Sequence, residues 1–210
     1  MGFEFEKDKQ LVISILGNRF SNIDTLILKD NFVSCESHWK SQTISLGLKK
    51  VKYLFICEAP PFTKPPFKYF YDGHSSPLLA RVLKAFINDE GKMYNSLKIY
   101  KELAQKGFLL VDSLPYALPF STQIRKKENY KQLVNNNLNW WINKLEDHFL
   151  FDENLKIAFG FKLNALKIIE STNNKLKIGK YTFDIDERNI ATDGSGMPNS
   201  NKLKKIFNLR

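Results

Sequence analysis

Three short apolar runs, each followed by a loop and then a helical pattern, most constrain the fold of this 210-residue chain. They occupy residues 51–57, 108–111 and 155–159, and each run stops at polar, glycine or proline residues. Short runs rich in β-branched and aromatic side chains predict buried strands. Strands that alternate with helices require right-handed crossovers and a mainly parallel sheet covered on both faces. We therefore expect an α/β protein with three layers, α/β/α.

Helical patterns fill the intervals between these runs. Ser76 and Pro77 suit a helix start, and Gly107 suits a helix end, which predicts helices over residues 77–88 and 97–106. The remaining expected helices cover residues 5–17, 22–30, 130–150, the segment from Gly160 to about 170, and a basic stretch ending near 209. Two further short strands are expected, over residues 181–185 and 189–192. We expect one domain over residues 1–210, with residues 1–50 as a helical extension packed on it.

The composition favours a folded protein with a polyanionic partner. The chain is 43% hydrophobic and carries a formal net charge of +10, and nucleic acid is the commonest polyanion. A lysine-rich proteome would produce the same charge, so this alternative stays open. The two cysteines, Cys35 and Cys57, match no metal or disulfide spacing, which favours a reduced cytoplasmic location. The sequence has no signal-peptide pattern and no apolar stretch of about 20 residues, so we expect no membrane insertion.

Polar residues follow the predicted strands at the places where ligands bind in parallel sheets. Glu58 comes after the first run, Asp112 after the second, and Gly160 after the third. Ligands bind such sheets beyond the carboxyl ends of the strands. The sequence therefore predicts a binding site at this edge.

Several segments, in order, resemble the uracil-DNA glycosylase superfamily over roughly residues 50–207. The first is Cys57-Glu58-Ala59-Pro60-Pro61, which is similar to the Gly-Glu-Ala-Pro-Gly motif of the iron–sulfur class. It is followed by an aromatic-x-Gly and Leu-Leu segment at 71–79, by the strand and prolines at 108–119, and by the strand ending in Gly160. The last is Gly196-Met197-Pro198-Asn199-Ser200, which resembles the Met-Pro-Ser-Ser-Ser loop of the mismatch-specific thymine/uracil enzymes. The resemblance implies a central four-stranded sheet.

The chain departs from the family in three respects. Cys57 stands where the iron–sulfur class has glycine, the cluster-binding cysteines are missing, and the final motif lacks its His-Pro-Ser form. The resemblance therefore implies an enzyme that uses no metal, no iron–sulfur cluster and no organic cofactor. No lysine is placed as a Schiff-base nucleophile, so we expect a monofunctional enzyme.

The resemblance implies a DNA glycosylase that flips a pyrimidine out of DNA and leaves an abasic site. Glu58 would activate water or stabilise the cationic sugar. Tyr71 would stack on the flipped base, and Cys57 and Ala59 would help to line the base pocket. Two alternatives remain: Glu58 only caps a loop, or Tyr71 only packs the proline-rich loop down.

Asp112 stands where the family usually has an asparagine that reads the uracil edge. An ionised aspartate only accepts hydrogen bonds, so it matches an exocyclic amine, as on cytosine or a modified cytosine, better than uracil O4. Asp112 as a capping residue, or as a protonated donor to O4, remains an alternative.

The polar segment 193–201 has two glycines and precedes a basic helix, which favours a close approach to phosphate. By resemblance its residues contact DNA, with Lys202 or Leu203 as the residue that fills the vacated stack, and His74 lies beside the pocket. The predicted DNA contacts are His74, Ser195, Met197, Pro198, Asn199, Ser200, Lys202 and Leu203. An ordinary polar turn remains the alternative for this segment. For residues 125–127, both a contact to the DNA backbone and a solvated helix start remain open.

Two rival functions remain. One is a catalytically inactive protein of the same fold that binds nucleic acid or a nucleotide in repair or phage defence. The other is a hydrolase of free nucleosides or nucleotides, whose ligand affinity would depend little on salt. The favoured prediction is a monomer that acts on DNA.

Overall fold

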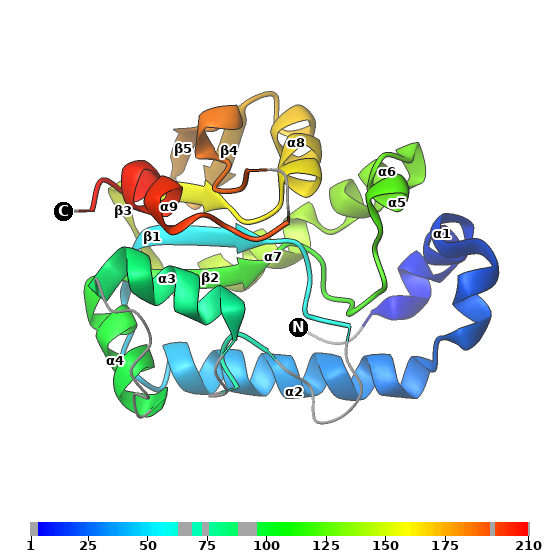
Figure 1. Cartoon of the computed structure of the whole chain (residues 1–210), viewed down its shortest axis with the longest axis horizontal. Helices are drawn as coiled ribbons and strands as arrows, with labels where there is room; N and C mark the ends of the chain where they lie inside the picture. The colour runs from blue at the N-terminus through cyan, green and yellow to red at the C-terminus, as the bar shows by residue number, and fades with distance from the viewer. Residues whose placement is uncertain (1–3, 63–68, 73–75, 88–95, 194–195, 210) are drawn as a thin grey trace.

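The computed structural model describes residues 4–62, 69–72, 76–87, 96–193 and 196–209 (Figure 1). In chain order the elements are α1 (Phe5–Leu16), η1 (Gly17–Asn22), α2 (Thr25–Thr43), β1 (Lys50–Cys57), α3 (Pro77–Ile87), α4 (Ser96–Lys106), β2 (Phe108–Asp112), α5 (Thr122–Arg125), α6 (Glu128–Asn136), α7 (Leu138–Glu146), β3 (Leu150–Phe159), α8 (Lys162–Ser171), β4 (Lys175–Ile178), β5 (Tyr181–Asp184), η2 (Glu187–Asn189) and α9 (Ser200–Phe207).

The central sheet has three parallel strands in the order β2-β1-β3. Beyond β3, Ile190 forms an isolated parallel bridge with Phe159, and the Ala191 N–H donates to the Phe159 carbonyl at 2.9 Å. The expected α/β class with a parallel sheet is confirmed. In the described residues the sheet itself has three strands, and the single bridge occupies the place of the fourth.

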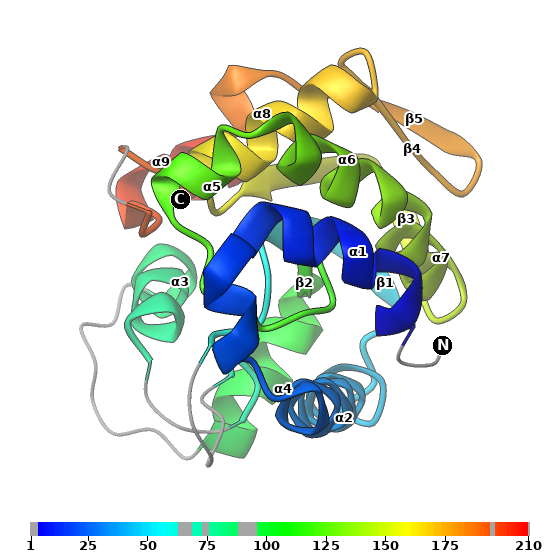
Figure 2. The same cartoon turned by 90° about the vertical axis from the view of Figure 1, so that its right-hand side faces the viewer.

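The strand order places the crossover helices on opposite faces. Because β2 and β3 lie on opposite sides of β1, right-handed crossovers put α3 and α4 on one face and α5, α6 and α7 on the other. Figure 2, which looks toward the carboxyl ends of the strands, shows α3 and α9 on the left of the sheet and α7 on the right. The face under α3 and α9 is closed by aromatic side chains, including Phe86 at 4.9 Å from Phe108 and Tyr53 at 5.5 Å from Phe207 between ring centroids.

The N-terminal helices are part of the same hydrophobic core as the sheet. Residues such as Val12 and Leu28 belong to one buried cluster with Leu54 of β1. The Trp39 indole of α2 donates to the Leu110 carbonyl of β2 at 3.0 Å. No single helix in the described ranges is long and apolar enough to cross a membrane, and Phe5–Ser21 and Thr25–Thr43 meet that test only as a pair bent by 116°.

Helix α1 lies across the end of the sheet where β1 and β2 terminate (Figure 2). The Phe5 ring meets Tyr116, just beyond β2, edge to face at 5.1 Å between ring centroids. The buried Asp8 carboxylate accepts hydrogen bonds from the Tyr116 hydroxyl at 3.0 Å and from the Asn137 amide at 2.9 Å. This helix therefore covers part of the edge that the sequence assigns to ligand binding.

Several elements differ from the expectations. The helix expected over 22–30 starts at Thr25 and continues to Thr43 as α2, and the strand expected over 189–192 is reduced to isolated bridges at Ile190 and Thr192. The helix expected over 130–150 is divided into α6 and α7 at Asn137, because the buried Asn137 amide turns back to the Leu133 carbonyl and to Asp8. Strand β3 begins earlier than expected, at Leu150. The expected strand at 181–185 is β5, which pairs with β4 in a separate antiparallel hairpin that the sequence reading did not anticipate.

Candidate active site

The strand ends bring the predicted site residues Glu58 and Asp112 into neighbouring positions. Cys57 is paired with Asp112 in the register of β1 and β2, and Glu58 directly follows Cys57. Gly160 directly follows β3, and its N–H donates to the Ile56 carbonyl at 2.8 Å. Glu58, Asp112 and Gly160 therefore lie at one edge, as parallel strands require.

The Glu58 side chain is buried and held on both carboxylate oxygens. The residue is 4% exposed. Arg125 of α5 donates from Nε to Oε1 and from an Nη atom to Oε2, both at 2.6 Å, and the Tyr130 hydroxyl of α6 donates to Oε1 at 2.5 Å. Such a two-point contact between a guanidinium and a carboxylate is the strongest ion-pair geometry that side chains form.

Further polar groups fix this arrangement. The Asn164 amide of α8 donates to the Tyr130 oxygen at 3.1 Å. The Ser113 hydroxyl lies 3.1 Å from both the Asn164 side-chain oxygen and the Glu58 carbonyl. Burial, followed by the Glu58 charge, raises the pKa of Tyr130 well above its usual value, so its hydroxyl stays protonated and donates. The Glu58 carboxylate is thus held directly by α5 and α6, and Asn164 and Ser113 support Tyr130 and the Glu58 main chain.

Arg125 connects Glu58 to the segment that precedes α9. Its guanidinium carbon lies 5.7 Å from the centroid of the Phe161 ring. The Phe161 ring also approaches to 3.6 Å the position that a Cβ would take at Gly196. The Glu58 contact raises the pKa of Arg125 further above its usual value. Glu58, Arg125, Phe161 and Gly196 form a continuous row of contacts.

Asp112 is a buried carboxyl group with an unused oxygen. Its Oδ2 atom is buried and has no hydrogen-bond partner in the part of the chain that the structure describes. Burial raises the pKa of Asp112 to about 7, while the positive charge of Lys144 and a hydrogen bond with the Tyr69 side chain act in the opposite direction. Near neutral pH both forms of Asp112 are therefore populated, one able to donate a hydrogen bond and one able only to accept.

Tyr71 lies in the core. The residue is 2% exposed, its ring meets Phe70 at 4.7 Å between centroids, and its hydroxyl accepts from the Leu110 N–H at 2.8 Å. Neither face of this ring is open for stacking in this conformation. An exposed aromatic nearer to Glu58 along the chain is Phe62, which is 52% exposed and which the sequence reading did not single out.

Cys57 and Ala59 flank Glu58 on either side. Cys57 is buried, and its sulfur packs against Gly160. Burial raises the pKa of Cys57 well above its usual value, so it remains a neutral thiol. Ala59 is half-buried against the core.

The turn before α9 holds its predicted residues in different ways. Met197 is 42% exposed, whereas Pro198 is buried and bridges to Thr192. The Asn199 side chain caps α9 by accepting from the Asn201 N–H at 2.9 Å, and the buried Ser200 hydroxyl donates to the Arg81 carbonyl at 3.0 Å. Met197 is the exposed apolar side chain of this turn.

The two residues considered for the vacated stack do not project from the turn. The Lys202 ammonium contacts Asp193 at 2.5 Å and the Thr192 carbonyl at 3.1 Å. Leu203 is fully buried in the core and would have to leave it to enter a duplex. His74 and Ser195 lie outside the described residues.

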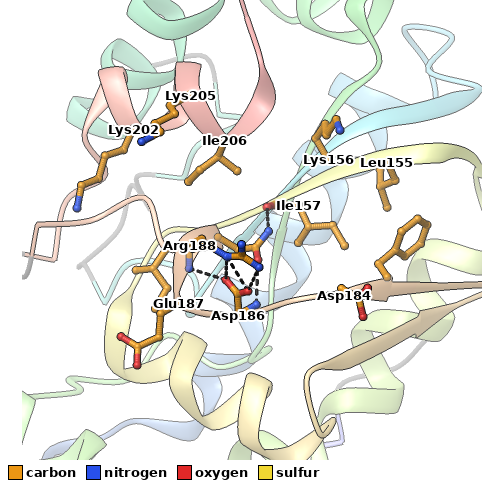
Figure 3. A pocket seen from close by; sticks show the side chains of 13 residues that line it. Leu155, Lys156, Ile157, Asp184, Asp186, Glu187, Arg188, Lys202, Lys205 and Ile206 are labelled. Atoms are coloured by element: carbon orange, nitrogen blue, oxygen red, sulfur yellow. Dashed lines mark hydrogen bonds and ion pairs between the residues drawn. The ribbon is translucent and has the colours of Figure 1, made fainter.

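A separate cavity of about 800 Å³ lies along the outer edge of β3, between η2 and α9 (Figure 3). Arg188 on its wall is already paired with Asp186, and the Asn189 amide donates a hydrogen bond to the Ile157 carbonyl at 2.8 Å. Lys202 is the one predicted site residue among those that line it. In the described ranges no group of three or more His, Cys, Asp or Glu side chains is placed to hold a metal ion.

Sequence reasoning missed Tyr130, a partner of Glu58, and Asn164, which contacts Tyr130, and left Arg125 undecided. All three reach the site from helices that follow β2 or β3, far from Glu58 in the sequence. Local sequence patterns carry no signal for these three residues, whereas Phe161, which contacts Arg125, follows Gly160 at a strand end and could have been noticed there.

No family model, no curated protein and no solved structure matches this chain.

Proposed function

We propose that this protein is a monofunctional DNA N-glycosylase, similar to the uracil-DNA glycosylase superfamily, that removes a flipped-out pyrimidine and leaves an abasic site. The observation that carries the proposal is the buried Glu58 carboxylate at the end of β1, adjacent in register to Asp112 at the end of β2. Ile190 bridges to the end of β3 and Thr192 pairs with Pro198 just before α9, and in our proposal the turn that carries Met197 is a second DNA contact.

Hydrolysis of the glycosidic bond breaks the bond between the base nitrogen and C1′ of the sugar. The electron pair leaves with the base, and C1′ becomes cationic until a water oxygen bonds to it. A carboxylate near C1′ stabilises that charge and accepts the proton of the water. In our proposal Glu58 has this role, and the base leaves toward Asp112.

Asp112 would select the base through its protonation state. The protonated form donates a hydrogen bond and suits the O4 atom of uracil, whereas the ionised form accepts one and suits the amine of cytosine or a modified cytosine. The pKa near 7 supports uracil excision at lower pH and excision of an amine-bearing base at higher pH. Tyr71 would support the pocket from the core, and Phe62 is the exposed aromatic available for stacking.

DNA would be bound by charge and by the turn before α9. The net charge of +10 favours the phosphate backbone. Met197, 42% exposed, is the side chain we propose to fill the space left by the flipped base. We propose that the protein works as a cytoplasmic monomer without a metal or organic cofactor.

A second candidate is a catalytically inactive protein that binds nucleic acid through the same edge. It is favoured by the pairing of both Glu58 oxygens with Arg125 and Tyr130, because a neutralised carboxylate stabilises a cation poorly. The two candidates predict the same DNA binding and different chemistry.

The test is release of a base from labelled oligonucleotides that carry uracil, cytosine or 5-substituted cytosines, detected as alkali-labile abasic sites. We expect release by the unmodified protein and a loss of roughly 100-fold or more in Glu58→Gln. The exposed Glu153→Gln is the matched control and should keep full activity.

Each alternative has its own signature in this assay. Salt-dependent DNA binding with no base released from any substrate would establish the inactive binder. Release from free nucleosides, with an affinity that hardly changes with salt, would replace DNA by a small-molecule substrate.

A further inference from the structure

We propose that Arg125 is a phosphate-binding residue that the free protein holds on Glu58, and that DNA draws it from the carboxylate onto a backbone phosphate. The transfer would leave Glu58 negatively charged and unpaired in the DNA complex. The proposal rests on the proposed function in taking DNA as the partner, and it adds a binding residue and the step that frees the carboxylate.

The geometry gives Arg125 access to a ligand that Glu58 does not have. The Arg125 side chain is 19% exposed, whereas that of Glu58 is 6% exposed. Arg125 uses its Nε and one Nη atom on Glu58. A guanidinium has five N–H donors in a planar fork, so donors remain for an anion that arrives from solvent.

A phosphate can replace the carboxylate without a change in bonding geometry. Both anions accept two parallel hydrogen bonds from a guanidinium. The Phe161 ring on which Arg125 rests, 5.7 Å away, is a platform that the guanidinium can keep while it changes partner. When Arg125 moves, Glu58 keeps the hydrogen bond from Tyr130, which holds the carboxylate in place.

In this proposal DNA passes beside Arg125 and the turn that precedes α9. Phe161, near Arg125, also lies beside Gly196, at the start of the turn that leads to α9. Asn199 occupies the cap of α9, and Met197 projects from the same turn. A backbone held at this turn would bring a phosphate toward the exposed part of Arg125.

If Glu58 and phosphate compete for Arg125, removal of the Glu58 charge must strengthen DNA binding. A purely structural ion pair predicts lower stability and no gain in affinity. A carboxylate that only repels DNA predicts a gain that does not depend on Arg125. A double-mutant cycle over Glu58 and Arg125 separates these cases.

The experiment measures fluorescence anisotropy of a labelled DNA duplex at several salt concentrations. Arg125→Gln should weaken binding about tenfold and reduce the slope of log affinity against log salt by about 0.9, the value for one phosphate contact. Glu58→Gln should tighten binding about tenfold, because Arg125 no longer has a competing partner. The double variant should bind like Arg125→Gln.

Controls separate competition from general charge effects and from misfolding. Glu153→Gln removes one exposed negative charge elsewhere on the chain and should not reproduce the gain of Glu58→Gln. Arg125→Lys keeps the charge without the two-point contact, so it should keep the salt slope that Arg125→Gln reduces.

The proposal is overturned if Glu58→Gln tightens binding equally with and without Arg125, or if Arg125→Gln leaves the salt slope as it was. The readout is independent of base release. If the double-mutant cycle shows coupling between Glu58 and Arg125 but no base is released, this proposal stands and the proposed enzymatic function is wrong. If base is released but the cycle shows no coupling, the proposed function stands and this proposal is wrong.

Discussion

Cys57 and Gly160 meet at the carboxyl ends of β1 and β3, where a Cβ added to Gly160 would lie 3.0 Å from the Cys57 sulfur and 3.2 Å from Cζ of Phe55. Both neighbours are buried, so neither can move into solvent. Gly160→Ala should therefore lower the free energy of unfolding by roughly 1–3 kcal/mol, as overpacked cores do. Urea unfolding of Gly160→Ala, Cys57→Ala and the double variant measures this, and the double variant should be less destabilised than the sum. Simple additivity would show that the two residues do not compete for space.

Asp112 should make stability depend on pH in a direction opposite to that of an ordinary paired carboxylate. Its pKa is about 7 in the folded protein and about 3.9 in an unfolded chain. Between these values the native state holds a proton that the unfolded state has lost, so stability falls as pH rises from 4 to 7 and then levels off. Three pKa units correspond to about 4 kcal/mol as an upper estimate.

Asp112→Asn removes this dependence and supplies the comparison. Relative to the unmodified protein, the variant should gain unfolding free energy steadily between about pH 4 and pH 7 in urea titrations. Lys144 faces the same group and acts to lower its pKa, and the value of about 7 already includes this opposing charge. A gap between the two proteins that stays constant over this range would contradict a raised pKa at Asp112.

Tyr71→Phe separates a supporting role for this ring from a stacking role. The Tyr71 hydroxyl accepts from the Leu110 N–H at the buried edge of β2. Its loss leaves a buried donor without a partner, which should cost about 1–3 kcal/mol of unfolding free energy. Phenylalanine stacks as well as tyrosine, so base release at saturating enzyme should hardly change. A variant with unchanged stability would contradict the role that the hydrogen bond implies.

The sequence predicts the positions of Glu58 and Asp112 because they depend on short-range patterns. Each follows a short apolar run, and parallel strands bring their carboxyl ends to one edge whatever lies between them. The burial of Leu203 could have been predicted from the sequence, because Leu203 and Phe207 are four residues apart, the spacing of an inward helix face. The resemblance to the family instead led us to expect a DNA contact at Leu203.

The partners of Glu58 depend on tertiary placement and could not be predicted from such patterns. Arg125 lies in a four-residue helix and Tyr130 in the next helix, which ends at the break at Asn137. That break depends in turn on a hydrogen bond with Asp8, more than 100 residues away in the sequence. No local pattern encodes a contact of this range.

Lys144 and Glu36 form a buried ion pair whose two halves should respond differently to mutation. Their charged atoms lie 2.5 Å apart, with Lys144 5% and Glu36 19% exposed at the side chain, and the Lys144 ammonium lies 4.0 Å from the centre of the Trp39 ring. Burial lowers the pKa of Lys144 below its usual value. Glu36→Ala would leave this buried cation unpaired and should cost about 3–5 kcal/mol of unfolding free energy. Lys144→Met keeps most of the volume and leaves a carboxylate that reaches water, so it should cost clearly less. Urea unfolding of both variants decides the point, and equal losses would show that the two charges are equally desolvated.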